Sequence, residues 1–391
     1  METEIRSGAG LMGLARLMKM AFDGEDLVPL GDALIKRAES DPLDANALMD
    51  LSTLLQLRHN REVALDVQSQ ALATKILYHL PANGEAKIRL LSIMAPGDIA
   101  TNAPLEFLVE NSDISLHMLY VGPGLPPVPP LPEHDLLFVS IGESTRTNPI
   151  LEELAQVLKS WPHPVLNGPA DILKTSREAA PVHLAKVAGL VMPGAKRVHR
   201  ADLSSVKDFP FIVRPVDSHG GHGLARIEDA RSIAEYLEKM PDPEFYVSPF
   251  VDYRSADGLY RKYRVALIKG RPHAAHMGIS DNWMIHFANA GMTESAEKRE
   301  EEARFMRDFD EDFARRHHEA LKGLSEILGL DYVVLDCAET RDGKLLVFEA
   351  DTGAVVHAMD PVEVFPYKAP QMKKVFSAFR DMLIGAMRAG T

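Results

Sequence analysis

The segment FIVRPVDSHGGHGL, residues 211–224, carries the most specific pattern in this sequence. Its first residues favour a strand, which ends at Arg214 and Pro215. Turn-forming residues follow at 217–223, DSHGGHG, and the apolar pattern returns at Leu224. The segment therefore predicts a strand, a glycine-rich turn and a returning strand.

The glycines of this turn favour an anion site. Without a Cβ atom, a glycine lets backbone N–H groups point at a phosphate. Arg214 adds a fixed positive charge at the end of the first strand. A plain hairpin is the alternative, because the turn lacks the Gly-Lys-Ser/Thr sequence that opens a helix in Walker-type sites. The residues downstream favour a triphosphate.

The composition is that of a soluble globular protein. The chain has 391 residues, a length that allows two or three domains. Of these residues, 46% are hydrophobic and 25% are charged, which is ordinary for globular proteins. Its net charge of −13 argues against nucleic acid or an anionic membrane as partner. Cys337 is the single cysteine, so no disulfide can form within the chain and a cytoplasmic location is expected. We find neither a signal peptide nor an apolar run long enough to span a bilayer.

The pattern of apolar residues predicts three segments. Residues 1–85 show helical spacing, as from Leu48 to Leu55, and resemble a single tetratricopeptide-type helical hairpin. Because such repeats need about three copies to bury their faces, we expect a helical cap instead. Residues 86–204 alternate short apolar runs with helical patterns, which predicts a small α/β domain with a largely parallel sheet. Residues 205–391 are expected to form two α+β lobes.

A second signal lies in the last predicted hairpin, residues 331–349. Asp336 is expected to end its first strand, and Glu349 and Asp351 lie two residues apart at the end of the second, on one face. Three converging carboxylates suit Mg²⁺ and would repel one another without a cation. Solvated strand-end acids are the alternative. Cys337 points to the opposite face and is expected in the core.

From Val165 to the C-terminus, the order of these features resembles the ATP-grasp superfamily of carboxylate–amine ligases. RPVDSHGG is similar to the Lys-Pro-Leu-Asp-Gly-x-Gly-Gly stretch of bacterial glutathione synthetases, and VFEAD, at 347–351, resembles the family's Glu-x-Asn metal motif. ILKTSREAAPVHLAKVAGLVMPGAKRV, at 172–198, resembles the segment carrying the first phosphate-binding lysine of glutathione synthetase and of ribosomal-protein glutamate ligases. The helical N-terminus lies outside the resemblance.

The resemblance implies an ATP-grasp fold, in which a small α/β domain precedes two α+β lobes that hold ATP between them. Arg214 stands where the family has a phosphate-holding lysine, and Arg177 lies near the position of the other. Tyr246 and Val247 belong to the linker whose backbone pairs with adenine. The residues implied to cover the phosphates are Ser218, His219, Gly220, Gly221, His222 and Gly223.

The resemblance also implies the residues of the chemistry. Arg264 would hold phosphate or an acyl phosphate, and Asp336, Glu349 and Asp351 would bind Mg²⁺. The chain departs from the family at several positions. Arginine replaces both lysines. This keeps the positive charge and adds a planar guanidinium that can donate two hydrogen bonds to phosphate oxygens. Asp351 replaces an asparagine, and Lys262 lies near where related ligases carry an acid.

The implied reaction joins a carboxylate to an amine on an amino acid or peptide, with ATP and Mg²⁺ as cofactors. A nucleotide-binding scaffold that recruits a partner through its N-terminal helices is the alternative, and a kinase-like enzyme is a third. Zinc is a further alternative on the number of histidines alone, since their spacing is not that of a tight metal site. We also expect that the protein could form a homo-oligomer. The highly charged residues 294–313 are either a lid or a solvated helix, and we favour the solvated helix.

Overall fold

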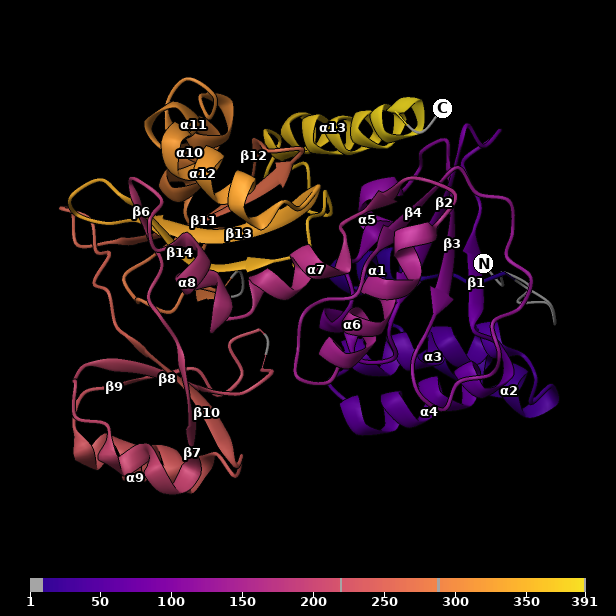
Figure 1. The fold of residues 1–391 in the computed structure, drawn as a ribbon, viewed down its shortest axis with the longest axis horizontal. Helices are drawn as coiled ribbons and strands as arrows, with labels where there is room; N and C mark the ends of the chain where they lie inside the picture. Colours follow the sequence, from indigo (N-terminus) through magenta and orange to yellow (C-terminus); the bar gives the residue numbers. More distant parts are fainter. Residues whose placement is uncertain (1–9, 219, 287–288, 390–391) are drawn as a thin grey trace. The chain divides into compact units, whose positions relative to one another are not determined.

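The computed structural model describes residues 10–218, 220–286 and 289–389, which divide into two compact units (Figure 1). Unit 1 comprises Met1–Ala170 and Thr352–Thr391, and unit 2 is Asp171–Asp351. Three β-sheets with flanking helices confirm the expected mixed α/β and α+β class. The three segments expected from the sequence divide the chain at other positions, and their boundaries stay a prediction.

Unit 1 begins with a group of helices, which confirms the expected helical N-terminus. Helix α3 begins after Asp44, whose side chain accepts the N–H of Ala47 at 3.0 Å, as an N-cap residue does. Helices α3 and α4 pack against each other as a hairpin. Their tetratricopeptide character stays a prediction. The helices are α1 (Leu14–Phe22), α2 (Val28–Ser40), α3 (Ala45–Leu57) and α4 (Arg61–Thr74).

The sheet of unit 1 has the strand order β1-β3-β2-β4-β5, and all its pairs are parallel except that of β1 with β3. Every residue of β4 is buried, as expected of a parallel strand covered on both faces. The largely parallel sheet is confirmed, whereas the expectation of helices up to residue 85 is wrong at β1. The strands are β1 (Leu77–Leu80), β2 (Ile88–Met94), β3 (Ile114–Tyr120), β4 (Leu136–Val139) and β5 (Val165–Leu166).

The C-terminal helix α13 (Lys368–Ala389) belongs to this unit, because it packs on α5 and β4. The ring centroids of Phe379, on α13, and Phe138, on β4, lie 6.0 Å apart. None of the helices in the described ranges is both long and apolar enough to cross a membrane. The remaining helices here are α5 (Leu105–Val109) and α6 (Asn148–Val157), with the 3-10 helices η1 (Ile99–Thr101) and η2 (Leu158–Ser160). Helix α7 (Pro169–Ile172) begins in unit 1 and ends in unit 2.

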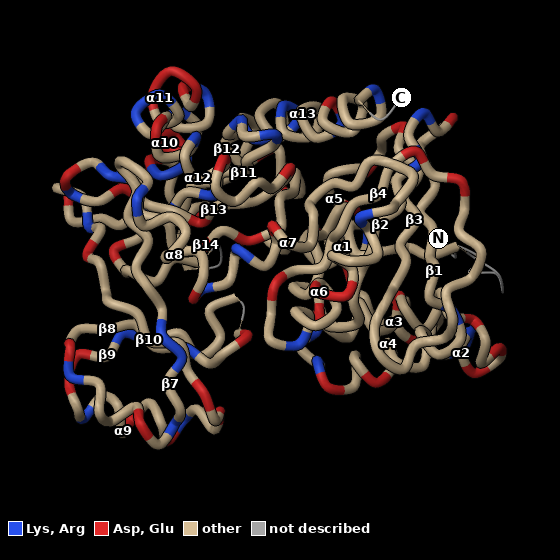
Figure 2. The backbone as a smooth tube through the Cα atoms, in the orientation of Figure 1, with Lys and Arg blue, Asp and Glu red and all other residues tan. Residues whose placement is uncertain are grey.

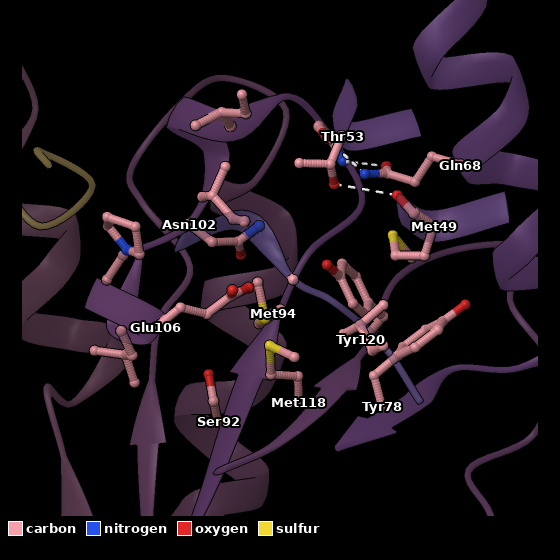
Figure 3. A pocket seen from close by; sticks show the side chains of 18 of the residues that line it. Met49, Thr53, Gln68, Tyr78, Ser92, Met94, Asn102, Glu106, Met118 and Tyr120 are labelled. Carbon is pink, nitrogen blue, oxygen red and sulfur yellow. Dashed lines mark hydrogen bonds between the residues drawn. The ribbon is translucent and has the colours of Figure 1, made fainter. Parts of the chain in front are cut away.

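A cavity of about 60 Å³ in unit 1 is lined by residues at the ends of β2 and β3 and by residues of α3 and α5 (Figure 3). Asp50 accepts the N–H groups of Met12 and Gly13 at 2.9 and 3.0 Å, and Glu106 accepts that of Ala15 at 3.1 Å. The two carboxylates thereby bind the backbone at the start of α1, where anions are favoured. Burial raises the pKa of Asp50 to about 6 and that of Glu106 to about 7. Among the described residues that line this cavity there is no Lys or Arg, so the cavity offers no fixed positive charge to a phosphate.

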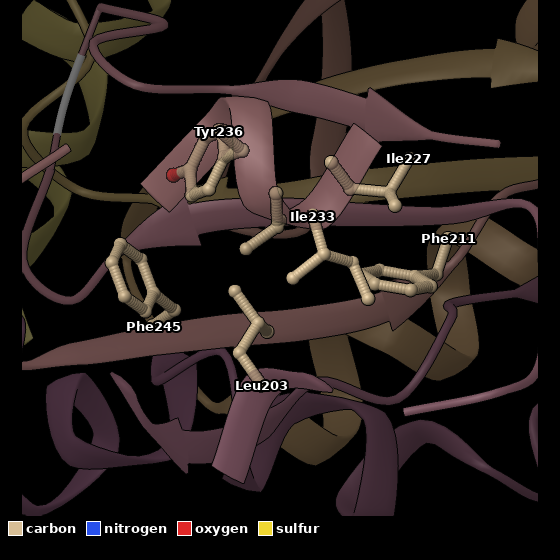
Figure 4. Close-up of a cluster of buried hydrophobic side chains, with 7 residues drawn as sticks. Leu203, Phe211, Ile227, Ile233, Tyr236 and Phe245 are labelled. Atoms are coloured by element: carbon tan, nitrogen blue, oxygen red, sulfur yellow. The ribbon is translucent and has the colours of Figure 1, made fainter. Parts of the chain in front are cut away.

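Unit 2 contains an antiparallel sheet with the strand order β7-β10-β8-β9. Phe211 pairs with Ile227, which confirms the strand, glycine-rich turn and returning strand expected from the sequence. The elements are β7 (Lys196–His199), η4 (Arg200–Ser205), β8 (Phe211–Pro215), β9 (Ala225–Ile227), α9 (Ala230–Lys239) and β10 (Glu244–Pro249). Figure 4 shows the core of this part, which includes Leu203, Phe211, Ile227, Ile233, Tyr236 and Phe245.

The second sheet of unit 2 has the strand order β12-β11-β13-β14-β6. It is antiparallel except for the pair of β14 with β6. Its strands are β6 (Leu190–Val191), β11 (Tyr260–Ile268), β12 (Arg271–Ser280), β13 (Tyr332–Glu339) and β14 (Leu345–Asp351). The helices of this part are η3 (Leu173–Thr175), α8 (Ala179–Leu184), α10 (Ala296–Arg307), α11 (Phe313–Arg316) and α12 (His318–Leu328).

Residues 294–313 include the expected helix, and its charged residues Glu297, Glu300 and Arg304 are exposed, but one face of the helix is buried. Helix α10 packs on β12, and Glu302, with 0% of its surface exposed, accepts the N–H of Met277 at 3.0 Å and hydrogen-bonds with His276 at 2.7 Å. Charged residues of both signs occur along α10 and α11 (Figure 2). The few apolar residues of the same segment are nevertheless buried, as Met306, Phe309 and Phe313 show.

Candidate nucleotide-binding site

Arg214, on β8, holds the glycine-rich turn by its side chain. Its Nε donates to the hydroxyl of Ser218 at 3.0 Å, and its Nη2 donates to the carbonyl oxygen of Ser218. The side chain is 11% exposed, and this burial lowers the pKa of Arg214 to about 10, so the guanidinium remains charged at neutral pH. A buried, charged arginine therefore fixes the first part of the turn.

The turn itself needs glycine at two positions. Gly221 has φ +76°, and a Cβ atom there would lie 2.1 Å from Nε2 of His286. Gly223 has φ +62°, and a Cβ atom there would lie 2.5 Å from Cδ of Pro215. Gly220, at φ +58°, meets open space, and His222 is exposed. His219, expected to cover phosphate, lies outside the described residues.

Tyr246 and Val247 do not lie in a linker. Both are inside β10, which is paired with β7 on one side and β8 on the other. Their backbone groups belong to these two ladders, so the expected pairing of this backbone with adenine does not fit. The side chain of Tyr246 is buried, and its hydroxyl accepts a hydrogen bond from Arg197 at 3.2 Å. The resemblance implied a linker here, and no local sequence pattern shows that strands flank the segment on both sides.

Asp336 is held by two cations from β11. Arg264 lies opposite Asp336 in the register, and its Nε and Nη2 donate to the two carboxylate oxygens at 2.8 and 3.0 Å. Nζ of Lys262 lies 2.7 Å from Oδ2 of the same carboxylate. Burial alone favours the neutral acid, but Arg264 and then Lys262 hold the pKa of Asp336 well below its usual range. Asp336 lies within β13, not at its end as expected.

Glu349 lies opposite Asp336 on β14 and is also paired with arginine. Arg177 donates to Oε2 of Glu349, and Nη1 of Arg214 lies 4.0 Å from the same oxygen. Burial acts to raise the pKa of Glu349, yet Arg177 and Arg214 bring it to about 2. Asp351 shares the strand face of Glu349, two residues further along.

The carboxylates fit magnesium in chemistry but only partly in arrangement. In the described ranges, no group of three or more His, Cys, Asp or Glu side chains lies close enough to hold a metal ion. Both oxygens of Asp336 are occupied by cations, which does not fit its expected role as a ligand. Glu349 and Asp351 remain as candidates, because Mg²⁺ is often held by one or two carboxylates together with phosphate oxygens.

The structure adds two residues to those expected. Lys262 is an integral part of the charged cluster, although the sequence showed it only as a departure from the family pattern. His286 contacts the glycine-rich turn at Gly221, and burial, together with the nearby Lys262, lowers its pKa. No sequence pattern links His286 to the turn, because the two are joined only by folding. Cys337 is fully buried, as expected, and burial raises the pKa of its thiol.

No family model and no curated protein matches the chain. Among solved structures, the crystal structure of VanG D-Ala:D-Ser ligase from Enterococcus faecalis is similar, with a TM-score of 0.46 and 14% sequence identity. The similarity covers 77% of this chain and 99% of that chain. At this identity, the likeness concerns the fold alone.

Proposed function

We propose that this protein is an ATP-dependent carboxylate–amine ligase of the ATP-grasp type. One observation carries the proposal: Arg214 contacts the glycine-rich turn through Ser218 and also lies 4.0 Å from Glu349. Glu349 in turn lies opposite Asp336, which Arg264 binds. Residues to which the sequence gives separate roles thus form one continuous charged network.

The charge of this network supports the binding of a polyphosphate. Four cations, Arg177, Arg214, Lys262 and Arg264, surround carboxylates on two neighbouring strands. Arginine binds phosphate oxygens through a planar fork, and glycine turns offer backbone N–H groups. The side chains of Arg177 and Arg264 are 24% and 29% exposed, so they are accessible to a ligand.

In the proposed reaction, the substrate carboxylate attacks the γ-phosphorus of ATP, the bond to the β-phosphate oxygen breaks, and ADP leaves. The amine then attacks the carbonyl carbon of the acyl phosphate, inorganic phosphate leaves, and the amine loses a proton. We assign to Arg264 and Arg214 the stabilisation of charge on the transferring phosphoryl group. Mg²⁺, if held by Glu349, Asp351 and phosphate oxygens, would further offset that charge.

ADP release separates this proposal from its rivals. Purified protein with ATP and Mg²⁺ would be screened against pairs of amino acids and small peptides, with ADP measured by a coupled assay and products by mass. A ligase releases ADP only when both an acid and an amine are present, and the product is the acid plus the amine less one water. ADP release with the acid alone would favour the kinase-like enzyme. ATP binding without release under all pairs would favour the scaffold.

A further inference from the structure

Lys262 and Arg264 reach the same carboxylate from one strand. They are two residues apart on β11, so their side chains leave the sheet on one face. Arg264 occupies both oxygens of Asp336, and the ammonium of Lys262 lies 2.7 Å from Oδ2. The Asp336 side chain is only 5% exposed, so little of it remains for another ligand.

This arrangement is incompatible with a divalent ion on Asp336. Mg²⁺ needs direct contacts of about 2.0–2.1 Å to oxygen in a near-octahedral shell. An ammonium at hydrogen-bond distance occupies that position and repels a second cation. The guanidinium of Arg264 binds both oxygens of the carboxylate, so the Asp336 side chain cannot turn toward a metal without losing this bidentate pair.

We propose that Lys262 takes the place of a divalent cation at Asp336, so that the site binds nucleotide phosphates without a metal ion on this carboxylate. The inference rests on the proposed function, since it concerns the same nucleotide site. Lysine has three N–H donors, and its side chain here is 25% exposed. The donors that Asp336 does not use are therefore accessible to phosphate oxygens. The protein therefore binds ADP with its own fixed cations, and any ion on Glu349 and Asp351 acts only in phosphoryl transfer from ATP.

The test compares nucleotide binding with and without metal. ADP serves as the probe because it cannot turn over, and its Kd is measured by calorimetry on the full chain in EDTA and in Mg²⁺. For the wild type we expect the two Kd values to agree within about fivefold. Lys262→Met should weaken ADP binding in EDTA by about tenfold or more, because it removes a charge-assisted contact to phosphate. Lys269→Met is the matched control, since Lys269 lies in the turn of the same hairpin and pairs with Asp331.

Binding of Mn²⁺ alone, followed by electron paramagnetic resonance, gives a readout that does not involve nucleotide. Lys262→Glu adds a carboxylate where the ammonium stood, and we expect it to bind more Mn²⁺ than the wild type and to need metal for ADP binding. Thermal midpoints check that each variant folds. None of the substitutions removes Arg264, the other partner of Asp336.

The possible outcomes separate a failure of the inference about Lys262 from a failure of the proposed function. If wild-type ADP binding requires Mg²⁺ and Lys262→Met keeps the same requirement, the inference is wrong and the nucleotide site stands. Equal Mn²⁺ binding by wild type and Lys262→Glu would also overturn it. If the wild type binds no ADP in either buffer, the proposed function fails and the inference fails with it.

Discussion

Arg177 and Glu349 form an ion pair although 172 residues separate them in the sequence. Arg177 follows η3, and Glu349 lies on β14. The sequence assigned the first to phosphate and the second to metal, and it predicted mutual repulsion among the acids. The structure instead pairs each of Glu349 and Asp336 with cations. The acid cluster is therefore neutralised by the protein itself.

The first prediction follows from this pair and reverses the effect expected from repulsion. Glu349→Gln should lower the thermal midpoint of the ligand-free protein by about 2–4 °C, for a loss of roughly 1 kcal/mol from a partly exposed pair. The pKa of Glu349 is depressed to about 2, so its contribution is present above the ordinary pKa near 4.5 and is lost as pH falls through 2. The difference between variant and wild type should thus shrink from pH 7 toward pH 3, as measured by calorimetric scans.

The same variant should reduce ADP release by at least roughly two orders of magnitude, or about 2.7 kcal/mol of transition-state stabilisation. Glu326→Gln is the control, because Glu326 belongs to an exposed pair with Lys322 on α12. Near-normal turnover in Glu349→Gln would mean that this carboxylate takes no part in the reaction.

A second prediction concerns Arg214. Arg214→Ala should weaken nucleotide binding by about 1.5–3 kcal/mol, because it removes a charge-assisted phosphate contact and releases the turn at Ser218. Arg214→Lys should retain more affinity than alanine, since it keeps the charge but not both contacts to Ser218. Calorimetry with ADP measures both. Arg231→Ala, at an exposed residue of α9, is the control, and unchanged affinity in Arg214→Ala would contradict the phosphate role.

A third prediction tests the shape of the turn. Gly221→Ala places a Cβ atom against His286 at a backbone angle of φ +76°. The strain should amount to about 1–2 kcal/mol, and we expect nucleotide binding to weaken by about tenfold because the turn must shift. Gly343→Ala, at φ +79° in open space, carries the same backbone cost in the turn between β13 and β14. Equal nucleotide affinity in the two variants would show that the shape at Gly221 is unimportant.

A fourth prediction concerns the pH dependence of unit 1. Burial raises the pKa of Glu106 to about 7, so the folded state binds more protons than the unfolded state between pH 4.5 and 7. Stability therefore falls as pH rises through this window. Glu106→Gln keeps an oxygen that can accept the N–H of Ala15 and removes the charge. We expect it to raise the thermal midpoint at pH 8 by roughly 3–6 °C and to change it little at pH 5. A variant that is less stable than the wild type at pH 8 would contradict this.

Local patterns in the sequence determined most of the elements of this protein. The hairpin around residues 211–227, the strands that carry Asp336 and Glu349, and the parallel strands of unit 1 all follow from short-range periodicity and turn residues. Cys337 was placed in the core because neighbours on a strand face opposite sides. These inferences succeed because they depend on residues that are adjacent in the chain.

Only the tertiary structure decided which residues meet. The pairing of Arg177 with Glu349, of Lys262 with Asp336, and the contact of His286 with Gly221 join segments that are distant in sequence. Folding likewise pairs β10 with β7 and β8, so Tyr246 lies inside a sheet and not in a linker. The energy of an ion pair depends on distance and burial, and neither can be read from residue types. The sequence therefore supplied the charges of the candidate site, and folding determined that they neutralise one another.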